Sequence, residues 1–391
     1  MTQTGKARLQ VMTPRDPNEP GRSASPLELF FDLVFVVAVG ITAAALHHSL
    51  ASGQVLNGVL NYGIVFFGIW WAWMNFTWFA TSFSTEDWLY RVLTFVQMAG
   101  VLVLAAGVQS AFEHQDYSVL VYAYVVMRLA LVTQWLRAYR GAPALRATTL
   151  RYAVGITVVQ CLWLGSLLLP SALHLVALGV LIAAELAVPV FSERSGTTPW
   201  HPHHITERYG LFALILLGES LLASANAIIA ALHEAEPIWP LVDIAAFTLV
   251  VTAALWWIYF WAPHHDAITS LRRSLLYGYG HFFIFAAAGA LSAGIETEID
   301  VRTGTSELTA VLASFAYTVP IAIFVLGVWL LTMRSHANRL VNLTVPLGAL
   351  LVLIDPLIPA PFALTSFILI ALVVTLVLNP ARDARASNPK E

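Results

Sequence analysis

Charged residues are scarce in this chain of 391 residues, since Asp, Glu, Lys and Arg together make up 11% of it. A soluble domain carries roughly 25% charge, so an ordinary soluble protein is excluded, and the lack of any basic run argues against a nucleic-acid partner. A lone cysteine, Cys161, excludes an intrachain disulfide and a thiolate metal site. The sequence also lacks a phosphate-binding loop, a nucleophile elbow and a dinucleotide fingerprint, so no cofactor is predicted.

Apolar residues dominate what is present, at 58% of the chain with a mean hydropathy of +0.74. A membrane-spanning helix needs about 20 consecutive, mostly apolar residues. The sequence therefore predicts an all-α, polytopic membrane helix bundle of about 12 transmembrane helices, with the lipid bilayer as its surroundings. The predicted spans are 27–50, 55–81, 88–112, 118–140, 148–169, 171–191, 205–232, 240–262, 273–295, 307–333, 338–356 and 360–379.

The basic residues indicate the orientation of these spans. They precede span one, follow span two, and recur on every second loop up to the C-terminal tail, whereas the intervening loops carry only Arg302. Cytoplasmic loops are enriched in Lys and Arg. The sequence therefore predicts a multi-pass protein of the cell membrane with both termini in the cytoplasm.

Two segments, starting at Trp70 and Trp256, resemble each other: each has two tryptophans, further aromatics, a polar loop and a Gly- and Ala-rich helix. Six spans separate them, so the sequence predicts two parallel six-helix repeats, residues 25–204 and 205–380. The alternative is that two membrane helices look alike because both are apolar. Residues 1–24 are expected to be a disordered cytoplasmic N-terminus, and residues 381–391 a cytoplasmic tail.

Two acids, Glu28 and Asp32, lie one helical turn apart at the start of the first span. Ser25 and Glu28 have the spacing of a capping box, so the structural interpretation of Glu28 is that it caps its helix. Asp32 lies about 10 Å further along the helix axis, beyond the reach of capping. A buried aspartate there must be protonated, be paired or face water.

Three further charged residues are predicted inside the membrane: Arg128, Glu185 and Glu219. An ionised side chain at the centre of a spanning helix is disfavoured by about 3 kcal/mol, so these residues should face inward and meet one another. Arg128 is the predicted counterpart of Asp32 or Glu219, because a guanidinium does not lose its proton. The set is either a site for a solute or proton, or a static network that locks helices together.

Two histidine clusters on predicted cytoplasmic loops are candidate metal ligands. Imidazole and carboxylate groups both bind metals, although no helical pair of histidines or cysteine supports a site here. The alternative interpretation is that these loop side chains are solvated. The candidates are His203, His204, His264, His265 and Asp266.

Several of these stretches resemble the bacterial low-temperature-requirement A (LtrA) family of multi-pass membrane proteins. The resemblance lies in "ELFFDLVFVVAV" with "LHH" after it, "WWAWMNFTWFATSFSTEDWLYRVLTFVQMAGVLVLAAGV", "ERYGLFALILLGES" and "WWIYF". It implies no catalytic residues, because the family name describes growth in the cold and not a mechanism. The family's recurring acids fall on Glu28, Asp32, Glu207 and Glu219.

The leading functional hypothesis is a secondary transporter or permeation protein for an unknown small solute, with or without coupling to protons. The candidate binding residues are Glu28, Asp32, Arg128, Glu207 and Glu219. The first alternative, less favoured, is an intramembrane enzyme acting on a lipid or another hydrophobic substrate. The second is a non-catalytic membrane component needed for growth in the cold.

Overall fold

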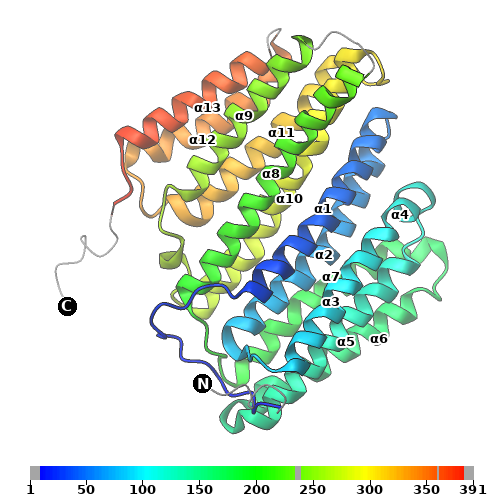
Figure 1. Cartoon of the computed structure of the whole chain (residues 1–391), viewed down its shortest axis with the longest axis vertical. Coiled ribbons are helices and arrows are strands. Elements are labelled where there is room, and N and C mark those ends of the chain that lie inside the picture. The colour runs from blue at the N-terminus through cyan, green and yellow to red at the C-terminus, as the bar shows by residue number, and fades with distance from the viewer. Residues whose placement is uncertain (1–8, 234–238, 359–360, 383–391) are drawn as a thin grey trace. The chain divides into compact units, whose positions relative to one another are not determined.

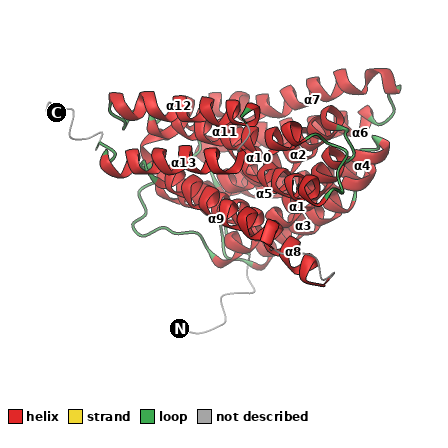
Figure 2. Cartoon of the chain, turned by 90° about the horizontal axis from the view of Figure 1, so that it is seen from above, coloured by secondary structure: helices red, strands yellow, loops and turns green. Residues whose placement is uncertain are grey.

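The computed structural model describes residues 9–233, 239–358 and 361–382, and these residues form helices and loops without any strand (Figure 1, Figure 2). Each predicted span corresponds to one helix or to two helices in succession. The helices are α1 (Pro26–Ala51), α2 (Val55–Phe83), α3 (Trp88–Ala106), α4 (Val108–His114), α5 (Ser118–Gly141), α6 (Arg146–Ser166), α7 (Ser171–Ser192), α8 (Pro202–His233), α9 (Trp239–Phe260), α10 (Leu271–Thr303), α11 (Ala310–Val328), α12 (Arg339–Ile354) and α13 (Pro361–Leu378).

Eleven helical stretches of the described chain are long and apolar enough to cross a membrane, and Phe362–Leu378 forms a shorter apolar helix. The predicted all-α bundle is therefore confirmed. The span predicted at 88–112 contains a break at Gly107, where α3 ends and α4 follows. α11 continues into a π-helical turn, Trp329–Met333, so the predicted span 307–333 also combines two elements.

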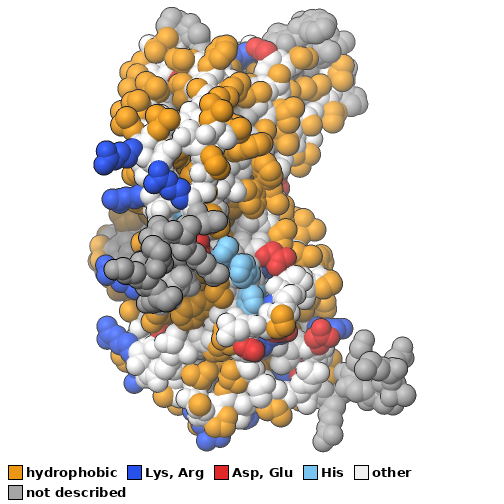
Figure 3. Space-filling model, turned by 90° about the vertical axis from the view of Figure 1, so that its left-hand side faces the viewer, with side chains coloured by type: hydrophobic (Ala, Val, Ile, Leu, Met, Phe, Trp, Pro, Cys, Tyr) orange, Lys and Arg blue, Asp and Glu red, His pale blue; other side chains and the backbone are white. Residues whose placement is uncertain are grey.

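The first helix shows how apolar side chains divide between the interior and the surface. Leu33, Val37 and Ile41 recur every four residues on an exposed face, whereas Phe31 and Phe35 are fully buried. Residues four apart lie on the same face of a helix, so this exposed stripe is continuous. Hydrophobic side chains also cover much of the molecular face in Figure 3. Apolar residues both inside and outside are expected for helices surrounded by lipid.

The chain divides into two compact units. The first unit comprises Met1–Ala38 and Gly68–Arg208, and the second comprises Val39–Phe67 and Tyr209–Glu391. Within the first unit α3, α5, α6 and α7 pack one against the next; within the second, α10 to α13 do the same and α13 also packs against α9 (Figure 1). The main division lies near the predicted boundary at residue 204, but the adjoining ends of α1 and α2 belong to the second unit. That the units are parallel repeats stays a prediction.

Most side chains of residues 9–24 are exposed, but a few contacts fix this segment on the first unit, which the expected disordered N-terminus did not include; residues 1–8 and 383–391 lie outside the described chain. Met12 is 1% exposed, and the Gln10 N–H donates to Asp87 Oδ2 at 3.1 Å. Burial alone would raise the pKa of Asp87, but hydrogen bonds from the Tyr90 N–H and the Arg137 guanidinium outweigh it and hold that pKa below its ordinary value. We call residues 9–25 the N-terminal strap.

Candidate functional site

Asp32 forms a buried ion pair with Arg208 in the first unit. Arg208 donates from Nε to Asp32 Oδ2 at 2.9 Å and from Nη2 to Oδ1, and the indole of Trp73 donates to Oδ1 at 2.7 Å. Both charged side chains are 0% exposed. A guanidinium and a carboxylate joined by two parallel hydrogen bonds form a strong, directional pair. This pair therefore ties α1, α2 and α8 together.

Glu28 combines the capping role with a second contact. The Ser25 N–H donates to Glu28 Oε2 at 2.8 Å and the Glu28 N–H donates to Ser25 Oγ at 3.3 Å, so the predicted capping box is present. The other oxygen, Oε1, lies 3.2 Å from His204 Nε2 and 3.3 Å from Arg208 Nη1. Arg208 thus contacts both acids on α1. We call Glu28, Asp32, His204 and Arg208 the α1–α8 cluster.

The predicted pairing of Arg128 with Asp32 or Glu219 was wrong. Arg208, one of the basic residues near the predicted cytoplasmic ends of the spans, takes that position beside Asp32. α8 begins at Pro202, so Arg208 already lies in the second turn of a helix and is fully buried. Two acids placed one turn apart attract a cation that reaches both, and Arg208 has that position.

Arg128 forms a separate buried pair with Glu185 in the first unit. Its Nη2 donates to Glu185 Oε2 at 3.0 Å, and the two side chains are 1% and 0% exposed. Trp71 Nε1 also donates to Oε2, at 2.9 Å, and Gln160 Nε2 donates to Oε1 at 2.8 Å. Glu185 therefore accepts hydrogen bonds from three helices, which joins α2, α5 and α6 to α7.

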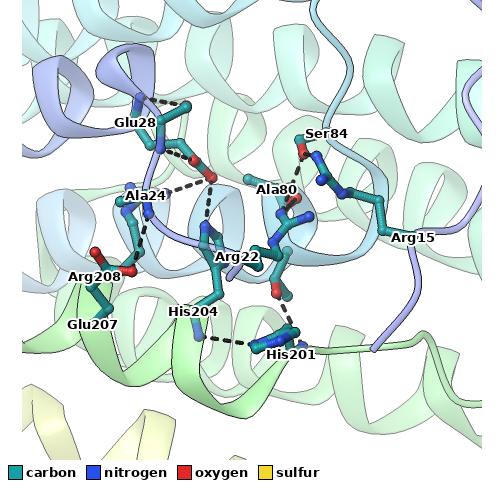
Figure 4. Close-up of polar contacts among 12 residues, drawn as sticks. Arg15, Arg22, Ala24, Glu28, Ala80, Ser84, His201, His204, Glu207 and Arg208 are labelled. Atoms are coloured by element: carbon teal, nitrogen blue, oxygen red, sulfur yellow. Dashed lines mark hydrogen bonds and ion pairs between the residues drawn. The ribbon is translucent and has the colours of Figure 1, made fainter. Parts of the chain in front are cut away.

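The N-terminal strap lies beside the α1–α8 cluster (Figure 4). Arg22 donates to the Ala80 carbonyl at 3.1 Å, and its side chain is 3% exposed. Glu207, a predicted binding residue, is exposed and accepts a hydrogen bond from the Ala24 N–H at 3.1 Å. A ring nitrogen of His201 contacts the Glu19 carbonyl at 3.0 Å. Glu207 thus contacts the strap from the first turns of α8, and its role as a binding residue stays a prediction.

Glu219, in the second unit, differs from all these acids. It is half-buried in the membrane-spanning part of α8, and no described residue forms a hydrogen bond or ion pair with it. Its carboxyl group faces Gly40 of α1, where an added Cβ would lie 3.2 Å from Glu219 Oε1. A charged residue, Glu296 of α10, is close enough to interact electrostatically with it. Glu219 is therefore a carboxyl group without a fixed counter-ion.

A histidine held between two acids lies in the same unit and was missed from the sequence. His47 Nδ1 is 3.1 Å from Glu296 Oε2, and His47 Nε2 is 2.7 Å from Asp300 Oδ2. The three side chains are partly exposed, at 14%, 32% and 28%. The signal available in the sequence was the "LHH" that follows the first apolar stretch.

The comparisons with known proteins agree with this architecture. The family described as "Bacterial low temperature requirement A protein (LtrA)" matches residues 23–378. The chain belongs to the LtrA family. An uncharacterized protein from Rhizobium meliloti (strain 1021) is 29% identical over 297 residues, which cover 70% of each chain. No solved structure matches. Family membership and the eleven long apolar helices make this a multi-pass membrane protein.

The two stretches most typical of the LtrA resemblance meet in the structure. "ELFFDLVF" supplies Glu28 and Asp32, and "ERYGLFALILLGES" supplies Arg208. The signal for Arg208 was therefore its place inside a stretch that carries the resemblance, directly after Glu207. Distance along the chain concealed the pairing, because Asp32 and Arg208 are 176 residues apart.

The candidate metal ligands have other contacts in this LtrA chain. His203 is exposed, His204 contacts Glu28, and Asp266 lies 3.6 Å from His265 and 3.2 Å from His336. In residues 9–233, 239–358 and 361–382, no three His, Cys, Asp or Glu side chains are grouped so as to hold a metal ion.

His264 belongs to a buried network with two tyrosines. Its Nε2 is 2.7 Å from the Tyr259 carbonyl, which only an N–H can approach, so Nδ1 accepts the hydrogen bond from the Tyr277 hydroxyl at 2.9 Å. Burial lowers the pKa of His264 to about 4. The ring is therefore neutral near pH 7 and acts as a structural connection.

Proposed function

We propose that this protein is a secondary transporter of the cell membrane that couples the movement of a small solute to protons, with Glu219 as the group that binds and releases the proton. One observation carries this proposal: Glu219 lies in a membrane-spanning helix without any hydrogen-bond or ion-pair partner among the described residues. A carboxyl group of this kind can change its protonation state without breaking an ion pair. Ionisable groups inside a membrane commonly belong to ion pathways or proton relays.

The other buried charges support the proposal by contrast. Asp32 and Glu185 each accept several hydrogen bonds, including one or more from an arginine. Protonating either acid would leave a buried guanidinium without its counter-ion, which is strongly unfavourable. These pairs therefore serve as a framework that keeps the helices in place while Glu219 changes its charge.

The proposed orientation has both termini in the cytoplasm, on the basis of the alternating basic loops. Reporter fusions at successive loops test it. A reporter that is active only in the cytoplasm is expected to be active when fused after residue 141 or 334. It should be inactive when fused after residue 115 or 305. The opposite pattern would contradict the proposed orientation.

Proton uptake into liposomes containing the purified protein is the direct test of the proposed function. A potassium gradient with valinomycin drives protons inward, and a trapped pH-sensitive dye reports their arrival, first without and then with pools of candidate solutes outside. Wild-type protein is expected to accelerate uptake above that of protein-free liposomes. Glu219→Gln should reduce uptake to the protein-free rate, because an amide cannot exchange a proton.

Glu207→Gln is the matched control, since Glu207 lies on the same helix but is exposed and accepts a hydrogen bond from the Ala24 N–H of the strap. It is expected to leave proton uptake unchanged. Equal uptake by wild type and Glu219→Gln, with and without solutes, would overturn the proposal and favour an enzyme or a non-catalytic membrane component. Size-exclusion chromatography of each variant establishes that it is folded.

A further inference from the structure

We infer that His47, held between Glu296 and Asp300, relays protons between water and Glu219. This inference rests on the proposed function and concerns the second unit alone. It assigns a positioning and proton-transfer role to three residues that the sequence did not single out. The proton enters at the end of α1 that is remote from the strap.

The contacts of His47 determine how protons are distributed in this group. A neutral imidazole carries one N–H, whereas both ring nitrogens of His47 face carboxylate oxygens, at 3.1 Å and 2.7 Å. Both contacts become hydrogen bonds when the ring is an imidazolium, or when one of the two carboxyls holds a proton that it donates to the ring. The three groups therefore share protons and form a chain from Asp300 through the ring to Glu296.

The remaining charged neighbours of His47 are few. His48 forms no ion pair with Glu296 or Asp300 among the described residues. The centre of its ring lies 5.1 Å from that of the His47 ring. The loop after α10 approaches the end of α1 through the Glu307 N–H, which donates to the Ala51 carbonyl at 3.1 Å. Among the described residues, no lysine or arginine forms an ion pair with His47, Glu296 or Asp300. The charge of this group therefore depends on protons and not on a fixed cation.

Glu296 connects this group to Glu219. It contacts His47 directly and interacts electrostatically with Glu219. On α1, Gly40 and His47 are seven residues apart, which places them on one helix face roughly 10 Å apart along the axis. Since the Glu219 carboxyl faces Gly40, that face of α1 lines the interval between Glu219 and His47.

The transfer proceeds without oxidation or reduction. Asp300, nearest the end of α10, takes a proton from water and passes it to His47 Nε2, and the imidazolium releases its other proton from Nδ1 to the Glu296 carboxylate. Glu296 then releases that proton to water in the interval, and this water protonates the Glu219 carboxylate, so that one proton enters and one O–H bond forms on Glu219. Rotation of the ring, or exchange with water, restores the starting tautomer.

The test uses the full chain in the same liposome assay, with His47→Ala and its neighbour His48→Ala as a matched pair. His47→Ala is expected to slow proton uptake about tenfold or more, within the range that a positioned acid–base group contributes. Adding imidazole to the outer buffer should restore much of the lost rate, because the free base can occupy the relay. His48→Ala should match wild type.

The outcomes separate this inference from the proposed function. If uptake depends on Glu219 but His47→Ala equals wild type, the relay is overturned and the transporter proposal stands. If His47→Ala is slow and imidazole has no effect at any pH, the role of His47 is structural and the relay is likewise overturned. Loss of uptake in Glu219→Gln with imidazole present is expected, because Glu219 lies after the relay.

Discussion

The two units of this protein treat buried charge in opposite ways. In the first unit, Asp32 and Glu185 each accept hydrogen bonds from an arginine and a tryptophan. In the second unit, Glu219 has no such partner, and His47 is shared between two acids. A carboxylate that is hydrogen-bonded to a buried guanidinium resists protonation, because protonation would leave the guanidinium without its counter-ion. A carboxyl group without such a partner can change its protonation state more easily. This difference supports the proposal that the first unit is a framework and the second unit binds protons.

Breaking the framework is expected to have the largest effect. Arg208→Met leaves Asp32 buried with only the Trp73 indole as a donor, which should lower the free energy of unfolding by about 3 to 5 kcal/mol. Thermal unfolding in detergent, followed by tryptophan fluorescence, measures the change. Arg91→Gln, at an exposed position, should leave the transition near that of wild type.

The double variant Asp32→Leu with Arg208→Met tests whether the pair is needed as a pair. Replacing both charges by apolar groups removes the uncompensated carboxylate, so most of the lost stability should return. A double variant as unstable as Arg208→Met would show that Asp32 is not the reason for the loss.

Acid should destabilise the second unit through His264 before it affects the carboxylates outside the membrane. The pKa of His264 is about 4 in the folded protein and about 6.5 when unfolded, so the unfolded chain binds more protons between these values. The contribution of His264 is full above pH 6.5 and is lost as the pH falls toward 4, by up to about 3 kcal/mol. Unfolding curves from pH 7 to 4 measure it.

His264→Gln keeps a neutral donor and acceptor but cannot titrate, so its stability should fall less steeply across the same pH range. Parallel curves for wild type and His264→Gln would contradict the assignment. The pKa of Asp87 lies below its ordinary value, so its contribution is present above pH 4 and is lost only at lower pH.

Displacing the strap should have a moderate effect. A Cβ on Gly141 would lie 2.1 Å from the Met12 carbonyl oxygen, a backbone atom that cannot rotate away. Gly141→Val should therefore displace the strap and lower stability by about 1 to 3 kcal/mol. Limited proteolysis should then cleave within residues 9–24 faster than in wild type. Gly165→Val, where a Cβ meets nothing within 4 Å, is the control.

The smallest effect on stability should come from Gly40→Ala. The added methyl group would press on the Glu219 carboxyl at 3.2 Å, while alanine favours the helix by up to about 1 kcal/mol, so the two effects nearly cancel. Proton uptake should nevertheless slow, because the carboxyl group is displaced. Gly218→Ala, with nothing within 4 Å of its Cβ, should change neither property. Unchanged uptake in Gly40→Ala would separate Gly40 from the site.

Much of the fold could be predicted because hydropathy acts locally. The windows from 27–50 to 360–379 all correspond to helices, and the Ser25–Glu28 capping box is present. That Asp32 must be protonated, be paired or face water was also predictable, since an isolated buried charge is too unfavourable to persist, and the structure shows it paired. The identity of its partner was not predictable from spacing, because Arg208 is 176 residues away and lies close to a predicted membrane edge.

The sequence by itself determined that this chain forms apolar helices, because each helix satisfies its own backbone hydrogen bonds and needs only a run of suitable residues. It also determined that the few charges within those runs must face inward. Only the tertiary structure decided that Arg208 meets Asp32, that Glu185 meets Arg128, and that Glu219 meets no cation in the described chain. Such pairings depend on which helix faces lie together, and that is settled by side-chain packing between segments remote in the chain.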